Sequence, residues 1–150
     1  MTQRMNYDTG APGGMKALGS VYGYVAQSGL PATLIELVYL RVSQINGCAY
    51  CIDMHSRELL KAEVPVEKLV LVPAWDEAGS LFSDQEKAAL KWAEVVTQVS
   101  DTHVPEEAYA EARATFTEKQ LTDLTIAVGL MNAYNRLAIS FRAVPSAAAA

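Results

Sequence analysis

Two cysteines and a histidine lie close together in the segment that reads CAYCIDMH, and their spacing could support thiol chemistry. On an α-helix, at about 100° per residue, Cys51 falls about 60° and His55 about 20° from Cys48, so all three share one face. Tyr50 and Asp53 then point elsewhere. Cys51 and His55 are one helical turn apart, which is close enough for the imidazole to take the thiol proton.

The two cysteines differ in their place on this helix. Cys48 is at its start, where free backbone N–H groups and the helix dipole stabilise a thiolate. Cys51 is the thiol that His55 can deprotonate. These two arguments point to different attacking thiols, and both assignments stay open. We favour Cys51 as the attacking thiolate, with Cys48 at the more accessible helix start as its resolving partner. The spacing also permits a disulfide with modest backbone adjustment.

Glu36 is the only acid in the apolar helix expected over residues 31–44. A buried carboxylate needs a partner, because burial disfavours its charge. His55 or Arg41 could be that partner. A Glu36–His55–Cys51 relay would make Cys51 a thiolate near neutral pH, whereas the alternative is a purely structural ion pair.

Other interpretations of these residues are open. A lone C-x-x-C can be two small buried residues without chemistry. With His55 and Glu36 the cysteines could bind zinc, although structural zinc sites usually bring a second Cys/His pair, which the chain lacks. His103 has the position of a solvated or capping residue. Trp75, Trp92 and the seven tyrosines are typical of a core or an interface.

The elements that must position these residues are helical almost throughout. Apolar residues recur at three- or four-residue spacing, whereas strand alternation never extends beyond a few residues. Capping boxes at Ser83 with Glu86 and at Thr117 with Gln120 open two of the helices. We predict an all-α fold of six or seven helices. They are expected over 16–28, 31–44, 48–62, a short piece between Pro65 and Pro73, 83–99, 105–115 and 117–141.

The composition is that of a single globular domain. The chain has 150 residues, of which 51% are hydrophobic and 19% charged, and this excludes a disordered chain. A net charge of −5 argues against nucleic-acid or anionic-membrane binding. Two cysteines are too few for a disulfide-rich secreted scaffold, and neither a signal peptide nor a membrane span is visible. We expect a soluble cytoplasmic protein, with residues 1–11 mobile or partner-bound and residues 147–150 frayed.

The cysteine segment resembles the alkylhydroperoxidase AhpD-like core of the carboxymuconolactone decarboxylase superfamily. The shared pattern is Glu36, eleven residues, then Cys48-x-x-Cys51-x-x-x-His55. The stretch RVSQINGCAYCIDMHSRELLK is close to the sequence that is usual in that family. The segment LMNAYNRL at 130–137 is similar to the family's C-terminal Asn-x-x-Asn-Arg helix. The resemblance covers roughly residues 15–143. It implies a single AhpD-like domain over residues 1–150, with ragged termini.

The resemblance implies an AhpD-like helical bundle that assembles as a homotrimer or as a homohexamer of three dimers, with peroxidase activity through the cysteine pair. Residue by residue, Glu36, Cys48, Cys51 and His55 fill the family's proton-relay and redox positions. Some members have His directly before the second cysteine. This chain has Tyr50 there, so the contribution of that histidine is absent or comes from a phenol. The decarboxylase branch lacks the cysteine pair, which counts against lactone chemistry.

We therefore expect a thiol-dependent hydroperoxide reductase, an antioxidant enzyme with peroxiredoxin activity. A thiolate attacks the peroxide O–O bond and becomes a sulfenic acid, and the other cysteine condenses with it to a disulfide. The sequence contains no flavin or nicotinamide fingerprint, and no resident cofactor or metal is expected. Electrons would come from an external dithiol or a protein reductant.

Two other functions stay open. One is a decarboxylase or isomerase of a small cyclic acid, with His55 and Glu36 as acid–base groups. The other is a non-enzymatic oligomer that senses oxidation through its cysteine pair. An oligomer is also expected from the burial pattern. Residues 31–44 are apolar on nearly every face, and leaving such side chains exposed would forgo stability that contact with symmetry mates recovers.

Overall fold

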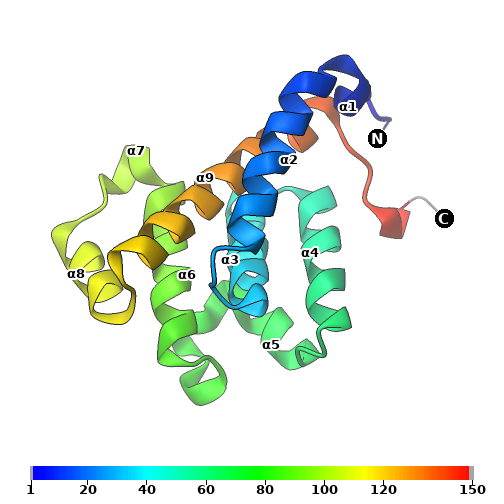
Figure 1. The fold of residues 1–150 in the computed structure, drawn as a ribbon. Coiled ribbons are helices and arrows are strands. Elements are labelled where there is room, and N and C mark those ends of the chain that lie inside the picture. The colour runs from blue at the N-terminus through cyan, green and yellow to red at the C-terminus, as the bar shows by residue number, and fades with distance from the viewer. Residues whose placement is uncertain (1, 149–150) are drawn as a thin grey trace.

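A computed structural model describes residues 2–148, which form helices and no strand (Figure 1). Within this range, six helices have ten or more residues, and the all-α prediction is confirmed. They are α2 (Pro12–Ala26), α3 (Ala32–Asn46), α4 (Ala49–Lys61), α6 (Asp84–Thr97), α8 (Glu106–Thr115) and α9 (Glu118–Phe141). The shorter segments are α1 (Tyr7–Gly10), α5 (Val66–Leu71), α7 (Val99–Thr102), η1 (Val72–Glu77), η2 (Gly79–Leu81) and η3 (Ser146–Ala148).

Helix α3 is the centre of the fold. It packs against α4, α6, α9 and η1, and Figure 1 shows it enclosed by these elements. An apolar residue on almost every face of a helix is typical of such a central position. The apolar surface of α3 is therefore covered within one chain, and the expectation that a second subunit must cover this helix is wrong.

The core has two main parts on either side of α3. The larger part joins α3 to α6, α8 and α9, and the smaller part joins α3 to α4 and η1. The larger part includes Val25, Leu34, Val38, Val42, Trp92, Phe116, Leu124 and Val128. The smaller part consists of Leu37, Leu40, Leu59, Val72, Trp75, Phe82 and Leu90.

A tight turn at Gly47 connects α3 to α4 and positions the cysteines. Gly47 has φ 69° and ψ 32°, a left-handed conformation that glycine adopts without steric cost. The N–H of Cys48 then donates to the carbonyl of Ser43 at 2.9 Å, which closes the end of α3. Cys48 is consequently the N-cap of α4, and the Asn-Gly helix stop expected from the sequence is confirmed.

The two predicted capping boxes are present. Ser83 with Glu86 opens α6, and Thr117 with Gln120 opens α9. The first long helix begins at Pro12 rather than at residue 16, because proline suits the first turn of a helix.

Near both ends of the described range, residues 2–148, the backbone makes hydrogen bonds to the helices. Asn6 caps α1, and the backbone N–H of Arg4 donates to the carbonyl of Phe141 at the end of α9, at 2.9 Å. The N–H of Ala147 donates to Asp53 on α4 at 3.3 Å, while residues 149–150 of the tail expected to fray lie outside the described residues. No helix within residues 2–148 is both long and apolar enough to cross a bilayer.

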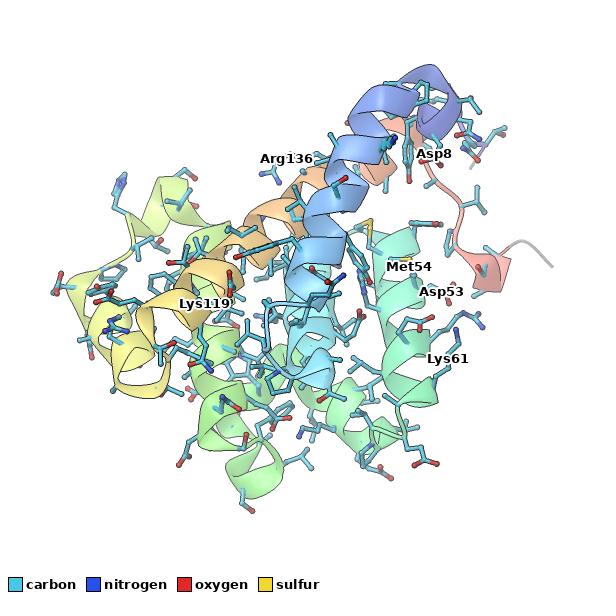
Figure 2. All side chains as sticks on the ribbon, viewed as in Figure 1. Asp8, Asp53, Met54, Lys61, Lys119 and Arg136 are labelled. Atoms are coloured by element: carbon cyan, nitrogen blue, oxygen red, sulfur yellow. A yellow bond between two sulfur atoms is a disulfide. The ribbon has the colours of Figure 1, made fainter. Side chains whose placement is uncertain are left out.

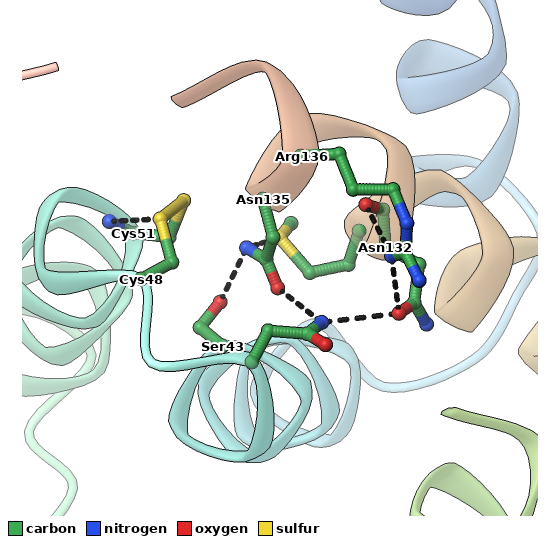
Figure 3. Close-up of a disulfide and its surroundings, with 8 residues drawn as sticks. Ser43, Cys48, Cys51, Asn132, Asn135 and Arg136 are labelled. Atoms are coloured by element: carbon green, nitrogen blue, oxygen red, sulfur yellow. Dashed lines mark hydrogen bonds between the residues drawn. A yellow bond between two sulfur atoms is a disulfide. The ribbon is translucent and has the colours of Figure 1, made fainter. Parts of the chain in front are cut away.

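A network of side-chain amides joins the last turn of α3 to α9 (Figure 3). The amide nitrogen of Asn46 donates to Asn135 at 2.9 Å and to Asn132 at 3.0 Å. Asn135 donates in turn to the Ser43 hydroxyl at 3.0 Å, and Arg136 donates to the Asn132 side-chain oxygen at 2.9 Å. The turn that carries Cys48 is therefore tied to α9 by hydrogen bonds as well as by packing.

Replacing Asn135 by alanine should lower the free energy of unfolding by about 1–3 kcal/mol, because the buried Ser43 hydroxyl and the half-buried Asn46 amide each lose a hydrogen bond. Urea denaturation followed by circular dichroism measures this change. The matched control is Arg136→Ala, which removes an exposed member of the network and should cost less than about 0.5 kcal/mol. Equal midpoints for Asn135→Ala and the wild type would contradict a structural role for the network.

Candidate active site

A carboxylate and an imidazole meet between α3 and α4. The Oε2 atom of Glu36 lies 2.7 Å from Nδ1 of His55. His55 is 1% exposed and the Glu36 side chain 17% exposed. A carboxylate can only accept, so a hydrogen bond from His55 to the Glu36 carboxylate requires the tautomer with its proton on Nδ1. Of the two partners considered for Glu36, His55 fills this position, while Arg41 pairs with Glu94 at 2.7 Å.

The other ring nitrogen of His55 is unpaired. Among the described residues, Nε2 is buried without a hydrogen-bond partner. Cys51 lies one turn earlier on the same helix and is also buried. An imidazole that is held by a carboxylate on one side and unpaired on the other is arranged to accept a proton from a nearby thiol.

Cys48 and Cys51 form a disulfide, with their Cα atoms 5.4 Å apart (Figure 3). Both cysteines are covered, at 1% and 2% exposure, by Ala138 of α9 and by Tyr50 and Ala143. The expectation that Cys48 is the more accessible sulfur is therefore wrong. The physical reason is that α9 and the chain that follows it pack over the start of α4.

Cys51 lines a cavity of about 400 Å³ that α1, α2, α4 and α9 enclose. Figure 2 labels two of its lining residues, Asp8 on α1 and Met54 on α4. Most of the wall is aromatic or thioether: Tyr7, Tyr22, Tyr50, Tyr134, Met15, Met54 and Met131. Such a wall favours the binding of an organic molecule with an apolar body.

The tyrosines of this cavity were missed by the sequence analysis, which placed them in the core or at an interface. Tyr50 was expected to point away from the cysteine face, and this is wrong because α1 and α9 extend the cavity around the start of α4. Its position between the cysteines was the only local signal. The others come from distant segments, so no spacing pattern could have joined them.

Two phenols lie next to the Glu36–His55 pair. The Tyr22 hydroxyl donates to Oε1 of Glu36 at 3.5 Å, and the Tyr39 ring lies 5.2 Å from the His55 ring and 5.9 Å from the Tyr22 ring. Burial raises the pKa of both phenols, and the charge of Glu36 raises the pKa of Tyr22 further. Both phenols therefore keep their protons at neutral pH.

The remaining sequence candidates are remote from this pair. His103 is exposed and ends α7 in a left-handed conformation. The indole N–H groups of Trp75 and Trp92 donate to Glu94 and Thr125, and both rings are buried as expected of core residues. Within residues 2–148, no three His, Cys, Asp or Glu side chains are grouped as a metal site.

Comparisons with known proteins identify a matching family and several similar proteins. The model of the carboxymuconolactone decarboxylase family matches residues 12–95. The uncharacterized protein YdfG of Bacillus subtilis is 38% identical over 140 residues, which cover 93% of this chain and 95% of that protein. The alkyl hydroperoxide reductase AhpD of Methylocella silvestris is 47% identical over only 45 residues, 30% of this chain and 25% of that protein.

A solved structure shares nearly the whole fold. It is a protein of unknown function from Agrobacterium tumefaciens, ATU0492, described provisionally as an antioxidant defence protein AhpD. It is 35% identical, has a TM-score of 0.92 and covers 96% of this chain and 98% of its own. The debrominase Bmp8, at 18% identity and a TM-score of 0.74, shares the fold over 88% of this chain and 70% of its own.

The Glu36–His55 contact predicts how the reduced cysteines react. In Glu36→Gln the neutral amide cannot stabilise the imidazolium that pairs with a thiolate, so iodoacetamide alkylation at pH 7 should slow about tenfold and its pH profile should move to higher pH. The matched control is Glu94→Gln, which removes the carboxylate paired with Arg41 and should leave the profile unchanged. Superimposable profiles for Glu36→Gln and the wild type would leave Glu36 a structural residue.

Proposed function

The chain belongs to the carboxymuconolactone decarboxylase family, and within it we propose a thiol-dependent hydroperoxide reductase whose redox pair is Cys48 and Cys51. The observation that carries this proposal is the Cys48–Cys51 disulfide beside the buried Glu36–His55 contact. Two sulfurs that can be oxidised by two electrons lie near a base that can generate a thiolate.

In the reduced protein, Nε2 of His55 takes the proton of the Cys51 thiol. The thiolate attacks the terminal oxygen of a hydroperoxide, the O–O bond breaks, and Cys51 becomes a sulfenic acid while an alkoxide leaves. Two observations support Cys51 rather than Cys48 as the attacking residue. Cys51 lines the cavity, and it lies one turn from His55.

The Cys48 thiol then attacks the sulfenic sulfur, the S–O bond breaks, and water leaves with the disulfide formed. The 5.4 Å separation of the two Cα atoms lies within the usual range for a disulfide. An external dithiol or a protein reductant returns both thiols and is itself oxidised to a disulfide. No resident cofactor takes part in this cycle.

The acid–base alternative uses the same Glu36–His55 contact for a cyclic acid. It assigns no task to the disulfide next to that contact, and the redox function is proposed for this reason. A sensor would form the same disulfide but would not turn over.

Cys48→Ser and Cys51→Ser should each lose hydroperoxide turnover with dithiothreitol as the donor, because the cycle needs both sulfurs. Peroxide consumption measures turnover, and circular dichroism should show that both variants stay helical. Full turnover by Cys48→Ser would remove its resolving role. If the wild type forms the disulfide with one equivalent of peroxide but does not turn over, the protein is a sensor.

Dimedone trapping identifies the attacking thiol in the same variants. We expect Cys48→Ser, treated with one equivalent of peroxide, to give a dimedone adduct on Cys51. We expect Cys51→Ser to give little adduct. The reverse pattern would assign the attack to Cys48.

We further propose that the chain forms a homotrimer or homohexamer through a face formed by α2 and α9. Of the fifteen residues of α2, Val25 alone is buried, and Lys16 is the single charged residue. Leu18 of α2 and Leu137 of α9 line a hollow to which Arg136 also contributes, and Val21, one turn after Leu18 on α2, is exposed. Contact with other copies would remove this apolar surface from water.

Light scattering at micromolar concentration should therefore give a mass of at least three chains of 16.2 kDa. Val21→Glu should lower that mass, because a charge is costly inside an apolar interface. Val70→Glu, on the exposed face of α5, is the matched control and should leave the mass unchanged. A wild-type mass near that of one chain would refute the oligomer.

A further inference from the structure

Tyr22 connects the buried relay to the cavity that Cys51 lines. Its hydroxyl donates to Oε1 of Glu36 at 3.5 Å. The same side chain, 39% exposed, lines both the 400 Å³ cavity and a small crevice of about 70 Å³ beside Glu36. Tyr22 belongs to α2, and its ring stacks on that of Tyr39 on α3, with the ring centroids 5.9 Å apart.

Each carboxylate oxygen of Glu36 therefore has its own hydrogen-bond partner. Oε2 faces Nδ1 of His55 at 2.7 Å, and Oε1 faces the Tyr22 hydroxyl. These contacts form a continuous path from the unpaired Nε2 of His55, through the imidazole and the Glu36 carboxylate, to the Tyr22 phenol at the cavity wall. Hydrogen bonds of this kind are often long before substrate binds and shorten in the reactive complex.

We propose that Tyr22 is the general acid that protonates the leaving alkoxide when Cys51 reduces a hydroperoxide, which rests on the function proposed above. The thiolate forms a bond to the terminal oxygen, the O–O bond breaks, and the alkoxide takes the phenolic proton. Nδ1 gives its proton to Oε2 of Glu36, the carboxyl group rotates and passes that proton to the phenolate, and Tyr22 is restored. His55 keeps the thiol proton on Nε2 and returns it to Cys51 when the external dithiol reduces the disulfide, while a proton released by that dithiol passes through Tyr22 and Glu36 back to Nδ1.

The balance closes without a further reactant. One thiol and one hydroperoxide give one sulfenic acid and one alcohol, and the sulfur is oxidised by the two electrons that the O–O bond accepts. Uptake of the thiol proton by His55 is thus matched by release of one proton at the cavity where the alkoxide forms, although His55 itself is 1% exposed.

The other phenols of the cavity lack this connection. Within residues 2–148, no hydrogen bond joins Tyr7, Tyr50 or Tyr134 to a carboxylate. Tyr22 alone among the cavity phenols of that range therefore couples proton release at the cavity to Glu36. Its ring also stacks on Tyr39, which holds the phenol in place.

Tyr22→Phe tests the proposal, because it removes the proton and keeps the ring. Single-turnover oxidation of the reduced protein is followed by rapid quench and mass spectrometry with two oxidants. tert-Butyl hydroperoxide releases a strongly basic alkoxide, whereas peracetic acid releases acetate, which needs no proton. We expect Tyr22→Phe to slow the first reaction about 10²-fold, the low end for general acid catalysis, and the second less than about twofold.

Tyr24→Phe is the matched control. It is two residues along the same helix, and its hydroxyl also donates to a carboxylate, that of Asp123 at 2.8 Å, but it does not line the cavity. It should change neither rate. A loss of folded Tyr22→Phe protein would slow both oxidants equally, so the ratio of the two rates reports the proton transfer.

Different results would refute the hydroperoxide reductase function and the acid role of Tyr22. If the wild type reduces neither oxidant, the hydroperoxide reductase is refuted, and Tyr22 loses its proposed task with it. If the wild type reduces both and Tyr22→Phe keeps the wild-type ratio, the function stands and Tyr22 is not the acid. Iodoacetamide alkylation should be the same in Tyr22→Phe and the wild type, because thiolate formation needs only His55 and Glu36.

Discussion

The contact between Glu36 and His55 is the constraint around which the site is organised. A carboxylate inside an apolar helix must find a partner, since burial without one would cost more than a small domain can spare. The imidazole on α4 is that partner, at 2.7 Å. Together with the apolar contacts of Leu37 and Leu40 with Leu59, this contact sets how α4 lies along α3, and with it the positions of the two cysteines that precede His55.

The turn at Gly47 and the amide network make that placement rigid. Gly47 reverses the chain directly before Cys48, and Asn46 and Asn135 anchor the reversal to α9 (Figure 3). The disulfide is consequently held between two well-packed helices instead of on a loop. Rigid support of this kind is what a site needs when a proton, a sulfur and a substrate oxygen must meet within small tolerances.

One helix, α2, carries residues of both the proposed chemistry and the proposed assembly. Tyr22 lines the cavity, Leu18 lines a hollow shared with α9, and Val21 is exposed. Association through that surface would hold α2, and therefore the phenol, in a fixed position over α3. The reactivity of Cys51 and the assembly of the chain would then depend on the same helix.

The sequence alone determined the local features, because these follow from short-range rules. Helical spacing, two capping boxes and the Asn-Gly stop predicted most of the long helices, and the pattern from Glu36 to His55 gave His55 as one of two possible partners of Glu36. Tertiary structure decided everything that depends on distant segments. α9 covers Cys48, four tyrosines from four helices line one cavity, and neighbouring helices of the same chain bury α3. The apolar pattern of α3 indicates that this helix is buried but not which elements cover it, and the other two arrangements leave no periodic signal, since they arise from how helices far apart in the sequence pack against one another.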